Sequence, residues 1–289
     1  MNSKIELLIQ AVNDLKGNGS IAKDYIYPVV MPFFSAFAGV VAAKLTFRHQ
    51  EKVKAEINKV NKLNELIIQM GEARSTLLSV KHNYKDLYEI HFIKRALIIP
   101  LIIIGDYKIK NYAGELSFLA DDDNNYTAAE YHKTWINIPR VGMMIGNYHQ
   151  VFTMLIKRNE LFLEVMNEIT SFKVKNKMAP DFAIEYKVLI SVVGEEKLLV
   201  LCDLTQSVIS LLDDVLFEIN DFMFKFPEQA NGKIDLKLTK DLCKVLRYKA
   251  GDYKLERTLE PDYESIAKYM GLTIVEAKSK YSYGYKRDA

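Results

Sequence analysis

Residues able to carry out nucleophilic, acid–base or metal chemistry are sparse and scattered along this 289-residue chain. Its two cysteines, Cys202 and Cys243, form no Cys-x-x-Cys pair, and its five histidines lack the spacing of metal ligands. The sequence also contains no glycine-rich phosphate loop, no His-Glu-x-x-His motif and no nucleophile elbow. We therefore predict a protein that is not an enzyme, with no catalytic residues, no bound metal and no cofactor.

Two groups of carboxylates are the remaining candidates for chemistry. The first recurs every four residues on one face of a predicted helix: Glu160, Glu164 and Glu168. The second crowds a later helix: Asp213, Asp214, Glu218 and Asp221. Helical bundles that bind two metal ions combine facing carboxylates with a Glu-x-x-His pair, which this sequence lacks. We interpret both groups as solvated helix faces.

An uncharged apolar stretch near the N-terminus dominates the layout of the chain. Residues 25–43 carry no charge, and as a helix they would reach about 28 Å, close to the thickness of the hydrocarbon core of a bilayer. We therefore predict a transmembrane anchor at 25–47, preceded by a short amphipathic segment at 1–24. A buried core helix and a signal peptide are the alternatives, the latter because Ala36-Phe37-Ala38 before Gly39 has the small-x-small pattern of a cleavage site.

Basic residues on one side of this stretch predict its orientation. The segment that follows it is rich in cations: Lys44, Arg48, Lys52, Lys54, Lys59 and Lys62. Lysine and arginine close to a span are retained on the cytoplasmic side, so we expect the N-terminus outside and the body in the cytoplasm. Tyr25 and Tyr27 at one end, and Lys44 and Arg48 at the other, would lie at the membrane interfaces.

Small residues recur within the predicted span. Ser35, Gly39 and Ala43 follow one another every four residues, and Ala38 and Ala42 repeat this spacing beside them. Such a stripe lets two helix backbones approach closely in lipid, which predicts a homo-oligomer formed through the span. The alternative is that small residues are simply frequent in membrane helices.

The remainder of the chain is predicted to be mainly α-helical. An apolar stripe from Val53 to Leu87 indicates a long juxtamembrane helix within 48–95, followed by a helical-bundle body at 96–226. Within that body we expect four helices: 127–148, 150–175, 181–193 and 196–225. A β-hairpin around Gly194 is an alternative to the last helix pair, and residues 105–125 read as loop or short strands. The apolar block 96–104 is too short to span a bilayer and is interpreted as a core segment, with a membrane-surface contact as the alternative.

A basic C-terminal helical region is predicted at 227–289, and it begins with a linker at 227–232. Residues 262–281 resemble a helix-turn-helix, with a capping box from Thr273 to Glu276, although a plain helical hairpin has the same pattern. If this region contacts nucleic acid, the residues at the contact are Lys278, Lys280, Tyr281, Tyr283 and Tyr285. A loose tail is the simpler interpretation of the last three, and the net charge of +2 argues against a chain dominated by nucleic-acid binding.

The complete layout is a membrane anchor, a basic helix and a helical body without a catalytic motif. It resembles the membrane-anchored effectors of bacterial anti-phage defence, including those encoded beside retron reverse transcriptases. The resemblance is one of architecture and carries over no functional residues. It implies an antiviral toxin at the bacterial inner membrane, which a regulatory protein or nucleoprotein complex holds inactive and which perturbs that membrane on release. The alternative is a membrane-tethered scaffold or nucleic-acid-binding regulator.

Overall fold

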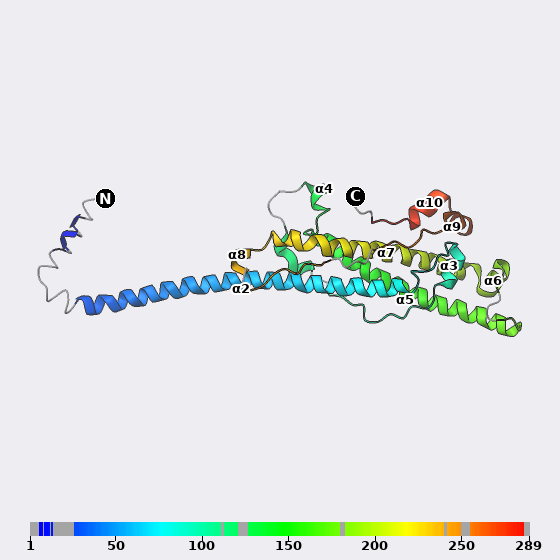
Figure 1. The fold of residues 1–289 in the computed structure, drawn as a ribbon, viewed down its shortest axis with the longest axis horizontal. Helices are drawn as coiled ribbons and strands as arrows, with labels where there is room; N and C mark the ends of the chain where they lie inside the picture. The colour runs from blue at the N-terminus through cyan, green and yellow to red at the C-terminus, as the bar shows by residue number, and fades with distance from the viewer. Residues whose placement is uncertain are drawn as a thin grey trace. The chain divides into compact units, whose positions relative to one another are not determined.

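The computed structural model describes residues 6–7, 9–11, 13, 26–110, 113–120, 127–179, 183–239, 242–249 and 255–285. These residues form helices and no strand (Figure 1). The longest helices are α2 (Tyr27–His82), α5 (Ile138–Lys175) and α7 (Glu195–Asn231). The shorter elements are α3 (Phe92–Ile98), η2 (Ala113–Leu119), α4 (Ala128–Tyr131), α6 (Tyr186–Val193), α8 (Leu236–Thr239), α9 (Tyr263–Met270) and α10 (Ile274–Tyr281). The prediction of a mainly helical protein is confirmed.

Helix α2 contains both the predicted anchor and the predicted juxtamembrane helix without an interruption between them. It ends at His82 rather than near residue 95. The side-chain amide of Asn83 donates to the carbonyls of Ser79 and Val80, at 2.9 and 3.1 Å, and so satisfies acceptors that the last turn leaves free. Lys81 and His82 in this turn add positive charge at the negative end of the helix dipole.

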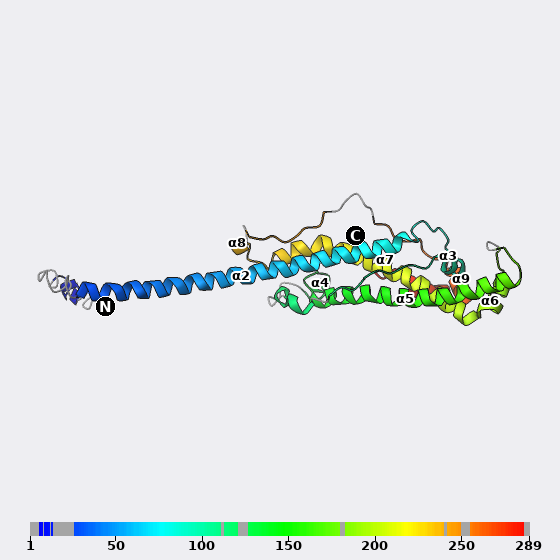
Figure 2. The same ribbon diagram turned by 90° about the horizontal axis from the view of Figure 1, so that it is seen from below.

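The chain divides into two compact units, residues 1–58 with 237–239 and residues 59–236 with 240–289. In the second unit, the part of α2 from Lys59 onward shares one apolar core with α5 and α7. Figures 1 and 2 both show α5 and α7 lying along each other. The sequence predicted a break in α5 near residue 149, but Tyr148, Val151 and Phe152 are all buried against this core, so the helix continues through that position.

Helix α5 begins later than the sequence predicts. The expected helix at 127–148 is divided into the short α4 and the start of α5 at Ile138. Asn137 is the reason, because its side-chain oxygen accepts from the amide of Arg140 at 3.3 Å and Pro139 fits the first turn of a helix.

Helix α7 overturns two further expectations. Its start after Gly194 and the helical conformation of α6 exclude a β-hairpin at this position. Its continuation to Asn231 shows that the predicted linker at 227–232 is wrong. Phe226 and Ala230 are fully buried in the core, and their packing keeps this turn helical although Pro227 lacks an amide hydrogen.

A second, smaller core joins α3, α6, the start of α7, α9 and α10. The apolar block at 96–104 is only half buried, since Ile99 and Ile102 are 3% and 2% exposed whereas Ile103 is 90% exposed. The capping box of α10 is confirmed: the hydroxyl of Thr273 accepts from the amide of Glu276 at 3.2 Å, and the carboxylate of Glu276 accepts from the amide of Thr273 at 2.8 Å. Gly271, with φ of 66°, supplies the left-handed turn between α9 and α10.

Candidate functional site: a buried charged clasp

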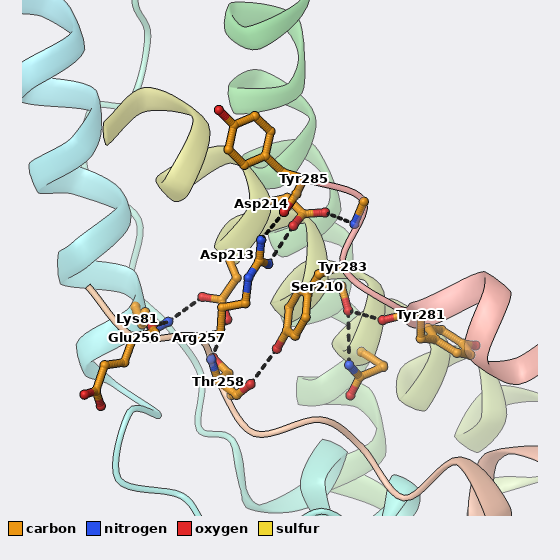
Figure 3. A network of polar contacts seen from close by, with 12 residues as sticks. Lys81, Ser210, Asp213, Asp214, Glu256, Arg257, Thr258, Tyr281, Tyr283 and Tyr285 are labelled. Carbon is orange, nitrogen blue, oxygen red and sulfur yellow. Dashed lines mark hydrogen bonds and ion pairs between the residues drawn. The ribbon is translucent and has the colours of Figure 1, made fainter. Parts of the chain in front are cut away.

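A network of charged residues fastens the C-terminal segment 255–285 to helix α7. We call it the clasp and define it as Lys81, Asp213, Asp214, Arg257 and Thr258. Figure 3 shows these residues converging from the end of α2, the middle of α7 and the segment that precedes α9. Two adjacent aspartates of α7 each hold a different part of the C-terminal segment.

Asp213 is the buried centre of the clasp, with none of its surface exposed. One carboxylate oxygen pairs with the ammonium of Lys81 at 2.5 Å, and the other accepts from the amide of Thr258 at 2.6 Å. Lys81, itself 6% exposed, also donates to the carbonyl of Glu256 at 2.6 Å. The two opposite charges and the surrounding backbone groups compensate for the removal of this pair from water.

Asp214 holds the chain on both sides of α9 and α10. Its carboxylate pairs with the guanidinium of Arg257 at 2.7 Å and accepts from the amide of Gly284 at 2.6 Å. The guanidinium lies 4.2 Å from the ring centre of Tyr283 and 4.6 Å from that of Phe217. A side chain at Gly284 would place its Cβ 3.3 Å from the carboxylate of Asp214, so glycine permits this close approach.

Further hydrogen bonds extend the clasp along α7. Ser210 donates to the carbonyl of Tyr281 at 3.0 Å, and the phenol of Tyr281 donates to Asp203 at 2.6 Å. The phenol of Tyr283 donates to the carbonyl of Thr258 at 2.6 Å, which ties the two ends of the segment to each other. Arg95 donates to the carbonyl of Leu259 at 2.5 Å.

The carboxylates of the clasp fasten the C-terminal segment to α7. Each oxygen of Asp213 and of Asp214 accepts a short hydrogen bond, from Lys81 or from the C-terminal segment. Burial raises the pKa of Tyr281 and of Tyr283 above the usual range of a phenol, and these side chains therefore remain donors at neutral pH.

The interpretation of the second carboxylate group, Asp213 to Asp221 on α7, as a solvated helix face is wrong. Asp213 is fully buried, and Asp221, 8% exposed, accepts from the indole of Trp135 at 3.0 Å and pairs with Lys225 at 2.9 Å. In the first group, Glu164 and Glu168 share Lys197, at 3.6 and 2.7 Å. Within the described ranges, no group of three or more histidines, cysteines or carboxylates could hold a metal ion.

The predicted nucleic-acid contact is corrected at Tyr281, which is 1% exposed and packed in the smaller core. Its ring cannot stack on a base. Tyr283 and Tyr285 are partly buried beside the clasp, and Lys280 pairs with Asp203 at 3.0 Å. Lys278 is exposed, with its ammonium 5.8 Å from the ring of Tyr263.

The predicted anchor residues that the structure describes lie on α2. Tyr27, Ser35, Ala38, Gly39, Ala42, Ala43, Lys44 and Arg48 are exposed, whereas Tyr25 lies outside the described residues. One described helix, α2, is long and apolar enough to cross a membrane, and 0% of its apolar window is buried. This finding disfavours the buried core helix among the alternatives, because such a helix would be mostly covered.

Sequence reasoning missed Lys81 and Arg257. A signal for Lys81 was present: it follows Leu77 by four residues and therefore interrupts an otherwise apolar helix face. A groove of about 470 Å³ lies beside the clasp and is lined by Lys81, Lys85, Glu256 and Arg257, among others. Its lining carries both signs of charge.

Glu218 gives this region a pH dependence. Burial raises the pKa of its carboxyl from 4.5 to about 7; Arg140 opposes the shift, while Asp214 and Asp221 add to it. Between these pH values the folded protein retains a proton that the unfolded chain releases, so stability falls as pH rises. Between pH 4.5 and 7.5 we expect the free energy of unfolding of the wild-type protein to fall by about 1–3 kcal/mol more than that of Glu218→Gln. Denaturant unfolding of both proteins at the two pH values measures this difference. An equal pH dependence of the two proteins would contradict a raised pKa of Glu218 in the folded state.

Comparisons with known proteins returned nothing: the chain matches no protein-family model, no curated protein and no solved structure.

Proposed function

We propose that this chain is a single-pass membrane protein and a non-enzymatic effector of the anti-phage, abortive-infection type. In this proposal, residues 25–47 cross the bacterial inner membrane with the N-terminus outside, and the helical body lies in the cytoplasm. A regulatory protein or nucleoprotein partner holds the effector inactive. Its release allows the spans to associate and to perturb the membrane.

The observation that carries the proposal is the exposure of the apolar stretch of α2. Phe33, Phe34 and Phe37 are 74%, 69% and 69% exposed. Each aromatic side chain buried in an apolar medium contributes about 1.5–3 kcal/mol relative to its exposure to water, so insertion into lipid is strongly favoured over solution. The same helix continues as far as His82, and cleavage after Ala38 would cut it within its apolar part.

Association of the spans is supported by the geometry at Gly39. A Cβ at this position would meet no described atom within 4 Å, so the face made by Ser35, Gly39 and Ala43 is open to a neighbouring helix. The hydrogen bonds of Asp213 and Asp214 to the C-terminal segment support a structural role for the clasp within the helical body.

The test is controlled expression of the full chain in bacteria, followed with a membrane-potential dye and growth curves. We expect the wild-type protein to resist carbonate extraction, to depolarise the membrane and to arrest growth. Gly39→Leu should weaken self-association by about tenfold and relieve the arrest, because bulk at this position separates the backbones. Val41→Phe adds bulk on the opposite face of the helix and should leave both properties unchanged.

Two results would contradict the proposal. Unchanged growth and potential with a correctly inserted wild-type protein would exclude the toxic effector. Full function of a chain that lacks residues 1–47 would instead favour a regulator that the anchor only localises.

A further inference from the structure

A stripe of basic residues begins where the apolar stretch of α2 ends. Lys44, Arg48 and Lys52 are all exposed and follow one another every four residues, so they share one face of the helix. None of the three pairs with a carboxylate among the described residues. Glu51 and Glu56 are the acidic residues nearest to the stripe in sequence, and three cations against these two carboxylates leave a positive balance.

The spacing of this stripe matches the depth of a lipid headgroup layer. Four residues advance an α-helix by about 6 Å, and the headgroup region extends about 5–8 Å beyond the hydrocarbon on each side. Long basic side chains direct their charges along the helix toward such a layer. If the apolar stretch ends at the edge of the hydrocarbon, the ammonium of Lys44 and the guanidinium of Arg48 reach the headgroups directly, and Lys52 lies one turn beyond.

The stripe also lies on the opposite side of the helix from the small residues. Nine residues separate Gly39 from Arg48, which at 3.6 residues per turn places them about 180° apart. Spans that associate through Ser35, Gly39 and Ala43 would therefore leave the three cations facing the surrounding lipid. The basic stripes of two copies of the chain would repel each other, because both are positively charged.

We propose that Lys44, Arg48 and Lys52 form a binding surface for anionic phospholipid headgroups of the phosphatidylglycerol and cardiolipin class. The phosphate of such a lipid accepts hydrogen bonds from Arg48 and is attracted by the two lysines. The proposal rests on the membrane anchor proposed above and adds the class of lipid that the anchor selects. Each cation near an anionic surface contributes to the attraction, so the preference should grow with the number of cations in the stripe.

The experiment uses the full chain, purified in an uncharged detergent and mixed with equal amounts of phosphatidylglycerol and phosphatidylcholine. Native mass spectrometry then counts the lipids that each protein retains. We expect the wild-type protein to favour phosphatidylglycerol, and the variant Lys44→Gln/Arg48→Gln/Lys52→Gln to lose about tenfold or more of that preference. The control Lys157→Gln/Lys175→Gln/Lys187→Gln makes the same change of net charge at exposed positions of the body and should retain the preference.

Three outcomes would overturn the proposal. The first is an equal lipid ratio for the wild-type protein and the stripe variant, and the second is an equal loss in the control. The third is displacement of the lipid by the same concentration of glycerol 3-phosphate, which would indicate a site for free phosphate. If the wild-type protein proves soluble without detergent, the anchor itself is refuted. Sedimentation with phosphatidylglycerol or phosphatidylcholine vesicles then decides the headgroup question separately.

Discussion

Replacement of Asp213 by alanine is expected to lower the free energy of unfolding of the helical body by about 3–5 kcal/mol. The substitution leaves the ammonium of Lys81 buried without its counter-charge and leaves the amide of Thr258 without an acceptor. The remaining bond from Lys81 to the carbonyl of Glu256 does not neutralise the charge. Denaturant unfolding of the detergent-solubilised full chain, followed by circular dichroism, measures the change.

The neighbouring residue provides the matched control for this prediction. The side chain of Asp214 is 18% exposed and that of its partner Arg257 is 25% exposed, so water compensates for part of a lost pair. We expect Asp214→Ala to cost about 1–2 kcal/mol. The double variant Lys81→Met/Asp213→Leu removes both charges and should recover part of the loss from Asp213→Ala. A cost at Asp213 no larger than that at Asp214 would contradict the central position of the buried pair.

The second large effect is expected at Arg158, which is 1% exposed. Its guanidinium donates to the carbonyls of Ala96 in the last turn of α3, of Ile99 at its C-cap and of Pro100 just beyond it, at 3.0, 2.5 and 2.8 Å. It therefore caps this helix with a positive charge at the negative end of the dipole. Burial lowers the pKa of Arg158 to about 10, and the group remains charged at neutral pH.

We expect Arg158→Met to lower the free energy of unfolding by about 2–4 kcal/mol, because the carbonyls of α3 lose a charged donor and stay buried. Arg158→Lys should give a smaller loss, since one ammonium cannot reach all three acceptors. The adjacent Lys157 is exposed, and Lys157→Met should change stability by less than about 0.5 kcal/mol. The same unfolding measurement compares the three variants, and equal stability of the Met variants would contradict the capping role.

Features determined by neighbouring residues could be predicted from the sequence. The turn between α9 and α10 depends on Gly271 and on the reciprocal bonds of Thr273 and Glu276, all within a few residues. The long helix after the anchor could also be predicted from local sequence, because its apolar positions repeat with the period of a helix over many turns.

Features determined by tertiary packing could not be predicted. Pro227 looked like the start of a linker, yet burial of Phe226 and Ala230 stabilises the helical turn around it. Arg158 is buried because α3, about sixty residues earlier in the sequence, places its carbonyls against the guanidinium, and no pattern near Arg158 indicates this contact. The partners Lys81 and Asp213 are 132 residues apart, so no local pattern relates them.

The clasp has a consequence for how the protein is made. The groups that complete the surroundings of Lys81 and Asp213 come from Glu256 and Thr258, and those that complete Asp214 come from Arg257 and Gly284, all of which follow α2 and α7 in the sequence. Domains fold as the ribosome releases them, N-terminal parts first. The apolar stretch of α2 therefore emerges from the ribosome long before synthesis supplies these partners. A chain whose synthesis stops before residue 256 would contain this stretch but would leave Asp213 without Thr258 and Asp214 without Arg257, so we expect its helical body to be less stable than that of the wild-type protein.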